Sequence, residues 1–259
     1  LMILVLGVLL GGAFSPEILE RIPRWPITLA SLLIYVLIAT IITYLYYRFV
    51  AKFDPRTAFF SAVPGGLNEM IILGESSGAD GRQISVAHTT RIFFVVTILP
   101  FFFRIFGDLG STVRTFAGGE TGTIEFFDVL ILTSCAIIGF YSAKFLRIPA
   151  PHITGPMIFS AGVHLLGLTS ASPPALIIAI AQVVLGISVG ARFAGLSFRN
   201  LGRIIWLGGI ATTILLIITV IFALILTSTA GFPFASLILA YSPGGLTEMS
   251  LIALTLNID

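Results

Sequence analysis

Five long blocks of apolar residues with few charges constrain what this chain can fold into. They are, in chain order, Ile27–Leu45, Ile84–Phe106, Val129–Phe145, Leu176–Val189 and Ile204–Leu226. Several reach the ~20 residues that an α-helix needs to cross a ~30 Å hydrocarbon core. Only 10% of the 259 residues are charged, whereas a soluble domain carries roughly 25%. Because too few polar side chains are present to cover a water-facing surface, the sequence predicts an all-α polytopic membrane protein.

The motif Pro-Gly-Gly-Leu-x-Glu-Met occurs twice, at residues 64–70 and 243–249. Aligning residues 1–80 with 180–259 without gaps matches twenty of the eighty positions, six of them in this motif. We interpret this match as an internal duplication within one integral membrane domain, with a first half at 1–127 and a second half at 128–259. Residues 81–127 and 128–179 have no counterpart in the chain. We therefore expect the first half to be incomplete at its N-terminus and the second half at its C-terminus.

The orientation of the two halves affects where a site would lie. Repeated halves in transporters place a site near the bilayer midplane, at the repeat interface. If the Pro-Gly-Gly segments are re-entrant, the halves are inverted, and the Lys and Arg residues outside the spans divide nine to four in favour of the cytoplasmic side. Parallel halves divide them eight to five. Both distributions satisfy the positive-inside rule, and we favour inverted repeats.

Each Pro-Gly-Gly is expected to break a helix, since proline lacks a backbone N–H and glycine tolerates conformations that other residues avoid. Non-helical backbone at membrane depth must be buried in protein or line a wet cavity, and such broken helices form many transporter sites. A half-helix starting near Gly66 would place Glu69 in its first turn, where free N–H groups favour a carboxylate. Burial favours the neutral acid instead. Such a carboxyl can exchange a proton or hold a cation; alternatively, the free N–H groups hold an anionic substrate.

The predicted site combines the two glutamates with the broken backbone and the adjacent polar residues. Its members are Glu69, Glu248, Pro64, Gly65, Gly66, Pro243, Gly244, Gly245, Asn68 and Thr247. A structural interpretation stands beside the functional one: each glutamate caps its own half-helix, as the acidic member of a capping box does. Acidic residues inside a membrane are costly and usually functional, and both copies keep this residue. We therefore favour a proton-, cation- or substrate-binding role.

His88 and Arg91 lie three residues apart in the apolar block 84–106, which places them on one helical face. Arg91 can pair with Glu69 or grip a substrate carboxylate or phosphate with two parallel hydrogen bonds. His88 titrates near neutral pH and can relay protons. The alternatives are an arginine that extends to the membrane boundary and a hydrogen-bonded interior histidine. Both residues are candidate site residues.

A second group of helix breakers lies at residues 151–157, Pro-His-Ile-Thr-Gly-Pro-Met. We expect a kink or an unwound segment here, with Gly155 and Pro156 as secondary candidates for backbone that lines the site; a tight turn is the alternative. Gly7 with Gly11, and Gly186 with Gly190, have the small-xxx-small spacing that favours close helix packing.

Several classes of function are disfavoured by what the sequence lacks. The three histidines show no metal-ligand spacing, and no zinc-protease, serine-hydrolase or P-loop motif occurs. We therefore expect no metal, no cofactor and no enzymatic activity. The single cysteine, Cys135, rules out an internal disulfide. The net charge of +2 comes from basic residues at the ends of apolar blocks, so we expect no nucleic-acid partner. The expected partners are the lipid bilayer and a small solute, and a homo-oligomer is left open.

The duplicated PGGLxEM motif, the downstream H-x-x-R at His88 and Arg91, and the run IPAPHITGPM at 148–157 together resemble the bacterial AbrB membrane-protein family. The resemblance covers essentially the whole chain. It implies a multi-pass protein of the bacterial inner membrane with a transporter-like architecture. The family carries labels such as ammonia monooxygenase and regulator of gene expression, and it shares its name with an unrelated DNA-binding regulator. The family pattern expects an H-x-x-R after each Pro-Gly-Gly motif, and only the first is present here.

Two functions follow from these observations. The first is a secondary transporter of a small anionic or amphipathic solute, coupled to protons or cations, with its site between the two repeats. The second is a membrane sensor or regulator of gene expression that binds a ligand without moving it. An oxygenase would need a cluster of metal ligands that the sequence does not offer.

Overall fold

The computed structural model describes residues 2–12, 14, 25–106, 126–148, 150–169, 171, 179–180, 183–184, 186–187, 190–191, 198–256 and 258. All regular elements in these residues are helices. The chain divides into two compact units. The first comprises Leu1–Pro23, Val113–Ile187 and Ser250–Asp259, and the second comprises Arg24–Thr112 and Ser188–Met249. Each unit therefore combines segments from both halves of the sequence.

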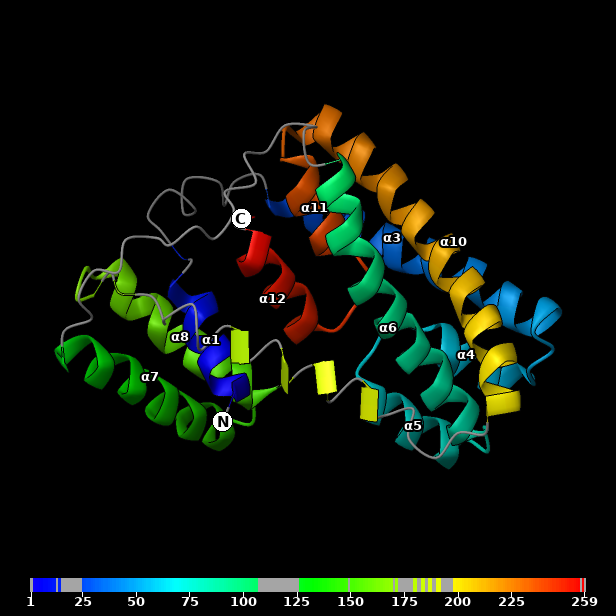
Figure 1. Cartoon of the computed structure of the whole chain (residues 1–259), viewed down its shortest axis with the longest axis horizontal. Coiled ribbons are helices and arrows are strands. Elements are labelled where there is room, and N and C mark those ends of the chain that lie inside the picture. Colours follow the sequence, from blue (N-terminus) through cyan, green and yellow to red (C-terminus); the bar gives the residue numbers. More distant parts are fainter. Residues whose placement is uncertain are drawn as a thin grey trace. The chain divides into compact units, whose positions relative to one another are not determined.

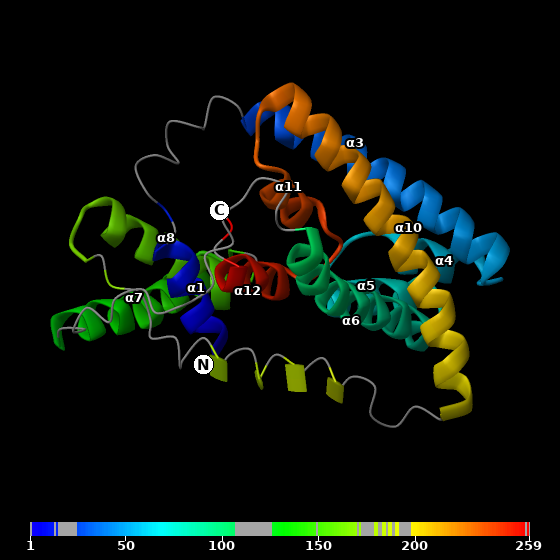
Figure 2. The same cartoon turned by 45° about the horizontal axis from the view of Figure 1, so that its top comes forward.

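The second unit is built around two long helices, α6 and α10. Its elements are α3 (Trp25–Leu45), the π-helix η2 (Tyr46–Val50), α4 (Pro55–Ala62), α5 (Leu67–Ser76), α6 (Gly81–Phe106), α10 (Phe198–Ala230), α11 (Phe234–Tyr241) and the start of α12 (Leu246–Leu256). The α10 helix packs against α3, α6 and α11, and α6 packs against α4 and α5. Figures 1 and 2 show α3 beside α10 in both views.

The α3 helix has one apolar exposed face and one buried face with polar groups. Leu33, Leu37 and Ile41 recur every four residues and are 69%, 63% and 56% exposed. On the other face Tyr35 is buried, and its hydroxyl lies 2.9 Å from Thr219 Oγ1 of α10. A stripe of large aliphatic side chains that faces outward is unfavourable in water and suits a lipid environment. The buried polar contact joins two helices inside that environment.

Four helices are long and apolar enough to cross a membrane within the part of the chain that the structure describes. They are Pro26–Val50, Gly81–Ile105, Phe127–Phe145 and Ile205–Ala230. They coincide with four of the five apolar blocks found in the sequence, whereas Leu176–Val189 falls largely outside the described residues. The prediction of an all-helical membrane-type protein is confirmed to this extent.

Aspartates fix the starts of α4 and α6. The Asp54 carboxylate accepts hydrogen bonds from the backbone N–H groups of Arg56 and Thr57 at 3.0 and 3.1 Å, and Pro55 occupies the first helical position. Asp80 accepts in the same way from the N–H groups of Arg82 and Gln83. These bonds satisfy N–H groups that have no partner within the helix. Slight burial raises the pKa of Asp54, but hydrogen bonds from Thr57 and the backbone outweigh it and leave the pKa below its usual value.

The first unit contains α1 (Met2–Gly12), α7 (Phe126–Phe145) and α8 (Pro151–Leu165), and α8 packs against both others. Glycines permit these contacts. A Cβ atom on Gly7 would lie 2.6 Å from the Ile153 carbonyl oxygen, and one on Gly11 would lie 2.5 Å from that of Met157. The backbones of α1 and α8 therefore approach closely, as small residues allow in membranes. The predicted packing role of Gly7 and Gly11 is confirmed. The same role predicted for Gly186 and Gly190 is not observed, because a Cβ atom on either would meet no described residue within 4 Å.

The Pro-His-Ile-Thr-Gly-Pro-Met segment is not unwound, because α8 begins at Pro151 and runs helically through Pro156. Proline suits the first helical position, where its missing N–H would have no partner anyway. Gly155 lies against α7, where a Cβ atom would sit 2.1 Å from the Gly139 carbonyl oxygen. The sequence signals were interpreted as a break, but here the breakers serve a helix start and a helix crossing.

Gly155→Ala is expected to destabilise the protein, because the new methyl group would meet rigid backbone rather than a flexible side chain. Overpacking of this kind costs about 1–3 kcal/mol. Gly162 on the same helix provides a matched control, since a Cβ atom there would have no neighbour within 4 Å. Gly162→Ala should leave stability unchanged or raise it by up to about 1 kcal/mol through helix propensity. Thermal unfolding of the two purified variants checks the difference; equal stability would contradict this account of the helix crossing.

Candidate functional site

Each Pro-Gly-Gly lies between two helices. In the first copy α4 ends at Ala62 and α5 begins at Leu67, with Gly66 as its N-cap at φ −61° and ψ 134°. In the second copy α11 ends at Tyr241 and α12 begins at Leu246. The bounds of α11 lie 179 positions after those of α4 at both ends, and α12 starts 179 positions after α5. The same offset relates the two copies in the sequence alignment.

The glycines of the motif make room for side chains rather than adopting left-handed backbone. The glycines with positive φ in the described residues are Gly78, Gly167 and Gly231. A Cβ atom on Gly66 would lie 2.0 Å from Oε2 of Glu69, and one on Gly245 would lie 2.0 Å from Oε2 of Glu248. Each carboxylate therefore folds back over the glycine that precedes its helix. The acidic member of a capping box has this position, three residues after the N-cap.

The two glutamates occupy different environments although their local geometry is the same. Glu69 is exposed, whereas Glu248 is 8% exposed. Asn68 is exposed, and the side chain of Thr247 lies outside the described residues. Pro64, Gly65 and Gly66 are exposed; Pro243, Gly244 and Gly245 are half-buried. Of the two copies, the second therefore buries its carboxyl within the protein.

His88 and Arg91 form a buried pair in the N-terminal half of α6. Nη2 of Arg91 lies 2.7 Å from Nδ1 of His88, and Nε2 of His88 lies 2.8 Å from the carbonyl oxygen of Phe60 in α4. A guanidinium only donates and a carbonyl oxygen only accepts. Nε2 therefore carries the imidazole proton and Nδ1 accepts from Arg91, so this geometry holds His88 as a neutral ring. The two residues lie on one helical face, as their spacing predicts, and His88 is hydrogen-bonded in the interior, which was the alternative interpretation of this residue.

Arg91 is buried, with 7% of its surface exposed, and its Nε has no hydrogen-bond partner in the described residues. Its guanidinium meets no carboxylate there, and no ion pair joins it to Glu69. Tyr35 and Tyr47 lie within electrostatic range of this cation. Three further buried polar atoms find no partner among the described residues: the hydroxyls of Ser61 on α4 and of Thr89 and Thr90 on α6.

A buried arginine without a counter-charge is energetically costly, because desolvation of an ion costs several kcal/mol. Charged side chains within spans usually face an interior or a wet cavity and mark a substrate or ion path. The Nε–H and neighbouring Nη–H groups of a guanidinium form a fork that matches a carboxylate or phosphate. The arrangement in α6 is therefore chemically suited to receive an anion, with His88 and the Phe60 carbonyl orienting the guanidinium.

Sequence reasoning missed several parts of this site. Tyr35 and Tyr47 were not selected, nor was the end of α4 around Phe60 and Ser61. Tyr35, inside the apolar block 27–45, was an available signal, because a buried hydroxyl needs a partner. The candidates Gly155 and Pro156 are buried in α8, which belongs to the first unit. In the described residues no three His, Cys, Asp or Glu side chains come together.

The whole chain, residues 1–259, matches the family model described as "Transition state regulatory protein AbrB". The chain belongs to the AbrB family. It is 28% identical to "Uncharacterized protein YhjN" of Bacillus subtilis (strain 168), over 99% of this chain and 70% of that protein. It is 26% identical to "Putative regulator AbrB" of Escherichia coli (strain K12), over 98% of this chain and 73% of that protein. No solved structure matches the chain.

This membership confirms the resemblance that the duplicated PGGLxEM motif, the H-x-x-R pair and the 148–157 run indicated. Together with the four apolar helices it establishes an AbrB-family protein of membrane type. The names of the family and of the Escherichia coli relative refer to regulation.

Proposed function

We propose that this protein is a secondary transporter of a small anionic or amphipathic solute in the bacterial inner membrane. The observation that carries this proposal is the buried Arg91, whose guanidinium contacts neutral His88 and meets no carboxylate in the described residues. A solute carboxylate or phosphate would supply the missing negative charge and occupy the free N–H groups. Since an isolated buried charge is costly, binding of such an anion would be strongly favoured over binding of a neutral or cationic solute.

The two Pro-Gly-Gly segments would form the flexible part of the transport machinery. The 179-residue offset shared by α4 with α11 and by α5 with α12 supports a duplicated architecture, which we propose to be inverted and multi-pass. Alternating access in such proteins moves one repeat against the other around a fixed site. Glu69 and Glu248 would serve as proton or cation groups that couple this motion to an ion gradient. The lipid bilayer and the solute are the proposed partners, without nucleic acid, and we propose no enzymatic activity.

Replacing the first glycine of each motif by alanine is expected to reduce transport more than stability. In Gly65→Ala with Gly244→Ala, the new Cβ atoms would lie 2.9 and 2.5 Å from the terminal methyl carbons of Met70 and Met249. Methionine side chains are adaptable and can move aside, so the fold should persist. The added methyl groups would restrict the backbone between the half-helices. Thermal unfolding and solute flux of the double variant should separate the two effects; full flux would show that these segments are not part of the machinery.

A ligand sensor that regulates gene expression is the second candidate, because the family description and the Escherichia coli relative's name both refer to regulation. The same Arg91 site would serve a sensor, but binding would then occur without movement of the ligand across the membrane. The two functions therefore agree on the site and differ in flux.

The test begins with thermal stability of the purified full-length protein against small organic acids and amines at two pH values. A ligand at one hundred times its Kd stabilises the folded state by about 2.7 kcal/mol. We expect stabilisation by anions and not by amines. Amines that stabilise as well as acids do would contradict the proposed charge of the solute. Acids that bind are then tested for flux into liposomes: flux supports the transporter, and binding without flux supports the sensor.

A further inference from the structure

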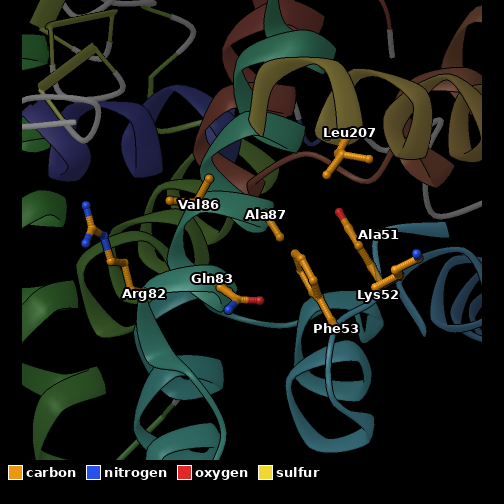
Figure 3. A pocket seen from close by; sticks show the side chains of 10 residues that line it. Ala51, Lys52, Phe53, Arg82, Gln83, Val86, Ala87 and Leu207 are labelled. Carbon is orange, nitrogen blue, oxygen red and sulfur yellow. The ribbon is translucent and has the colours of Figure 1, made fainter. Parts of the chain in front are cut away.

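A pocket lies in the second unit where η2, the start of α6 and the start of α10 meet (Figure 3). Its volume is ≈ 330 Å³, enough for a small organic molecule. The wall is formed partly by apolar groups, among them Phe53, Val86 and Leu207, and partly by polar groups. Figure 3 shows Ala87 on the side of α6 that faces Leu207 of α10, and Val86 on the side nearer Arg82.

The charged side chains that line this pocket are both cations, Lys52 and Arg82. Figure 3 places them at opposite edges of the group of lining side chains. Two nearby arginines are occupied by the backbone: Arg48 donates to the carbonyl oxygen of Phe53 at 2.9 Å, and Arg56 to that of Ser77 at 2.7 Å. Neither Lys52 nor Arg82 forms an ion pair with any of the described residues. The pocket therefore combines apolar walls with a positive potential at its edges, which concentrates anions.

Two carboxylates lie close to lining residues in sequence, and both are engaged. Asp54 follows Phe53 and caps α4; the other is Asp80. It accepts hydrogen bonds from the backbone N–H groups of Arg82 and Gln83, and its second oxygen accepts from Nε2 of Gln83 at 2.8 Å. It thereby caps α6 and holds the Gln83 amide in place. The other lining residues carry no negative charge.

The inner wall of the pocket adjoins the Arg91 site. Tyr47 lines the pocket, is 3% exposed and stacks on Phe53 with ring centroids 5.3 Å apart. It also lies within electrostatic range of Arg91. Tyr47 belongs to a π-helical segment, η2, and such segments are frequent at functional sites. Ala87, which also lines the pocket, directly precedes His88 on α6. One side chain and one helix thus connect the pocket to the buried guanidinium.

We propose that this pocket is a vestibule that binds the solute before it reaches Arg91, and that the solute is a carboxylate or phosphate ester with a compact apolar body. Lys52 and Arg82 attract its anionic group, and the walls around Phe53, Val86 and Leu207 bind its apolar part. The Tyr47 ring separates the vestibule from the guanidinium. This inference rests on the proposed function for the direction in which the solute moves. The pocket's preference for water-soluble anions follows from its lining residues alone.

The experiment measures how fast a cysteine in the pocket reacts with charged thiol reagents, and it needs no knowledge of the solute. Cys135, the single cysteine among the 259 residues, is first changed to serine. Val86→Cys then reports from the α6 wall, and Leu207→Cys from the α10 wall in case the first variant does not fold. Val96→Cys is a control of the same residue type on the same helix, because Val96 does not line the pocket. The reagents are the sulfonate-bearing and the trimethylammonium-bearing methanethiosulfonates, applied to full-length protein in nanodiscs of neutral lipid.

We expect the pocket cysteines to react with the anionic reagent on the order of tenfold faster than with the cationic one, after correction for their rates with a small free thiol. Lys52→Gln with Arg82→Gln should abolish this preference, whereas Lys144→Gln in the first unit should leave it intact. Acids that stabilise the protein should slow the reaction. Equal rates with both reagents, or a pocket cysteine no faster than Val96→Cys, would overturn the proposal.

Further outcomes distinguish a lipid headgroup from a soluble anion in the pocket, and a failure of the vestibule from a failure of the transport function. If phosphatidylglycerol in the nanodiscs protects the pocket cysteines and soluble acids do not, the pocket holds a lipid headgroup and the vestibule is refuted. If the pocket shows its anion preference but no acid moves across the membrane, the proposed transport fails while the pocket remains a binding site for soluble anions. If flux occurs without protection of the pocket, the vestibule fails and the transporter stands.

Discussion

Arg91→Met is expected to abolish anion binding and transport while leaving the protein as stable as wild type or more stable. Replacing a buried charged group by an apolar residue of similar volume is often neutral or stabilising by about 1–4 kcal/mol. Arg91 meets no carboxylate in the described residues, so the substitution strands no buried counter-charge. His88 loses the hydrogen bond that Arg91 donates to its Nδ1. It keeps the hydrogen bond that its Nε2 donates to the Phe60 carbonyl oxygen.

The loss of binding should be large. Removing one partner of a buried, hydrogen-bonded charge pair costs about 2–5 kcal/mol, which corresponds to roughly 30-fold to several-thousand-fold in Kd. Arg91→Lys should also bind poorly, because an ammonium cannot offer the two parallel donors of a guanidinium. Thermal unfolding with and without an anionic ligand measures both quantities. A variant that unfolds far more easily without ligand and still binds would show that Arg91 stabilises the fold rather than an anion.

Glu248→Gln is expected to uncouple transport from the proton gradient, with a larger effect than Glu69→Gln. Glutamine keeps the side-chain oxygen that a capping box requires but cannot ionise. A capping role therefore survives the change to glutamine, and a proton-carrying role does not. The difference between the two residues follows from exposure, since Glu248 is 8% exposed and Glu69 is exposed. Both variants should keep stability within about 1 kcal/mol of wild type, as expected for a retained cap.

The measurement compares uptake driven by an inward proton gradient with exchange of the solute at equal pH on both sides. Wild type should show both. Glu248→Gln should keep exchange and lose the gradient-driven component, and Glu248→Ala, which also removes the cap, should in addition be less stable. If Glu248→Gln and Glu69→Gln both behave as wild type in every assay, the glutamates are caps and the coupling group lies elsewhere.

The general character of the fold was predictable because it depends on composition and local pattern. The apolar block 27–45 became α3 with an identical C-terminal bound, and 129–145 became α7. Each Pro-Gly-Gly lies between two helices, where proline and glycine act through their own backbone. The 151–157 run misled for the same reason: the same residue types also start helices and permit close crossings, and only the Gly139 backbone distinguishes these uses.

The candidate site was predictable only in part. The shared helical face of His88 and Arg91 follows from their three-residue spacing. The difference between Glu69 and Glu248 does not, because exposure depends on neighbours far away in sequence. The same holds for the pocket, where Lys52 precedes Arg82 by thirty positions and Leu207 comes from another helix. Lys52 also adopts positive φ, at 60°, which is uncommon for a residue with a side chain. Pattern reasoning cannot bring such residues together.

The most direct test of the central claim is untargeted uptake. Liposomes that contain the full-length protein are incubated with a mixture of small organic anions and cations, washed, and analysed by mass spectrometry. The account predicts that at least one anion and no cation accumulates with wild type, and that this anion does not accumulate with Arg91→Met. Accumulation of the same solute to the same level with Arg91→Met, or of cations alone with wild type, would contradict it.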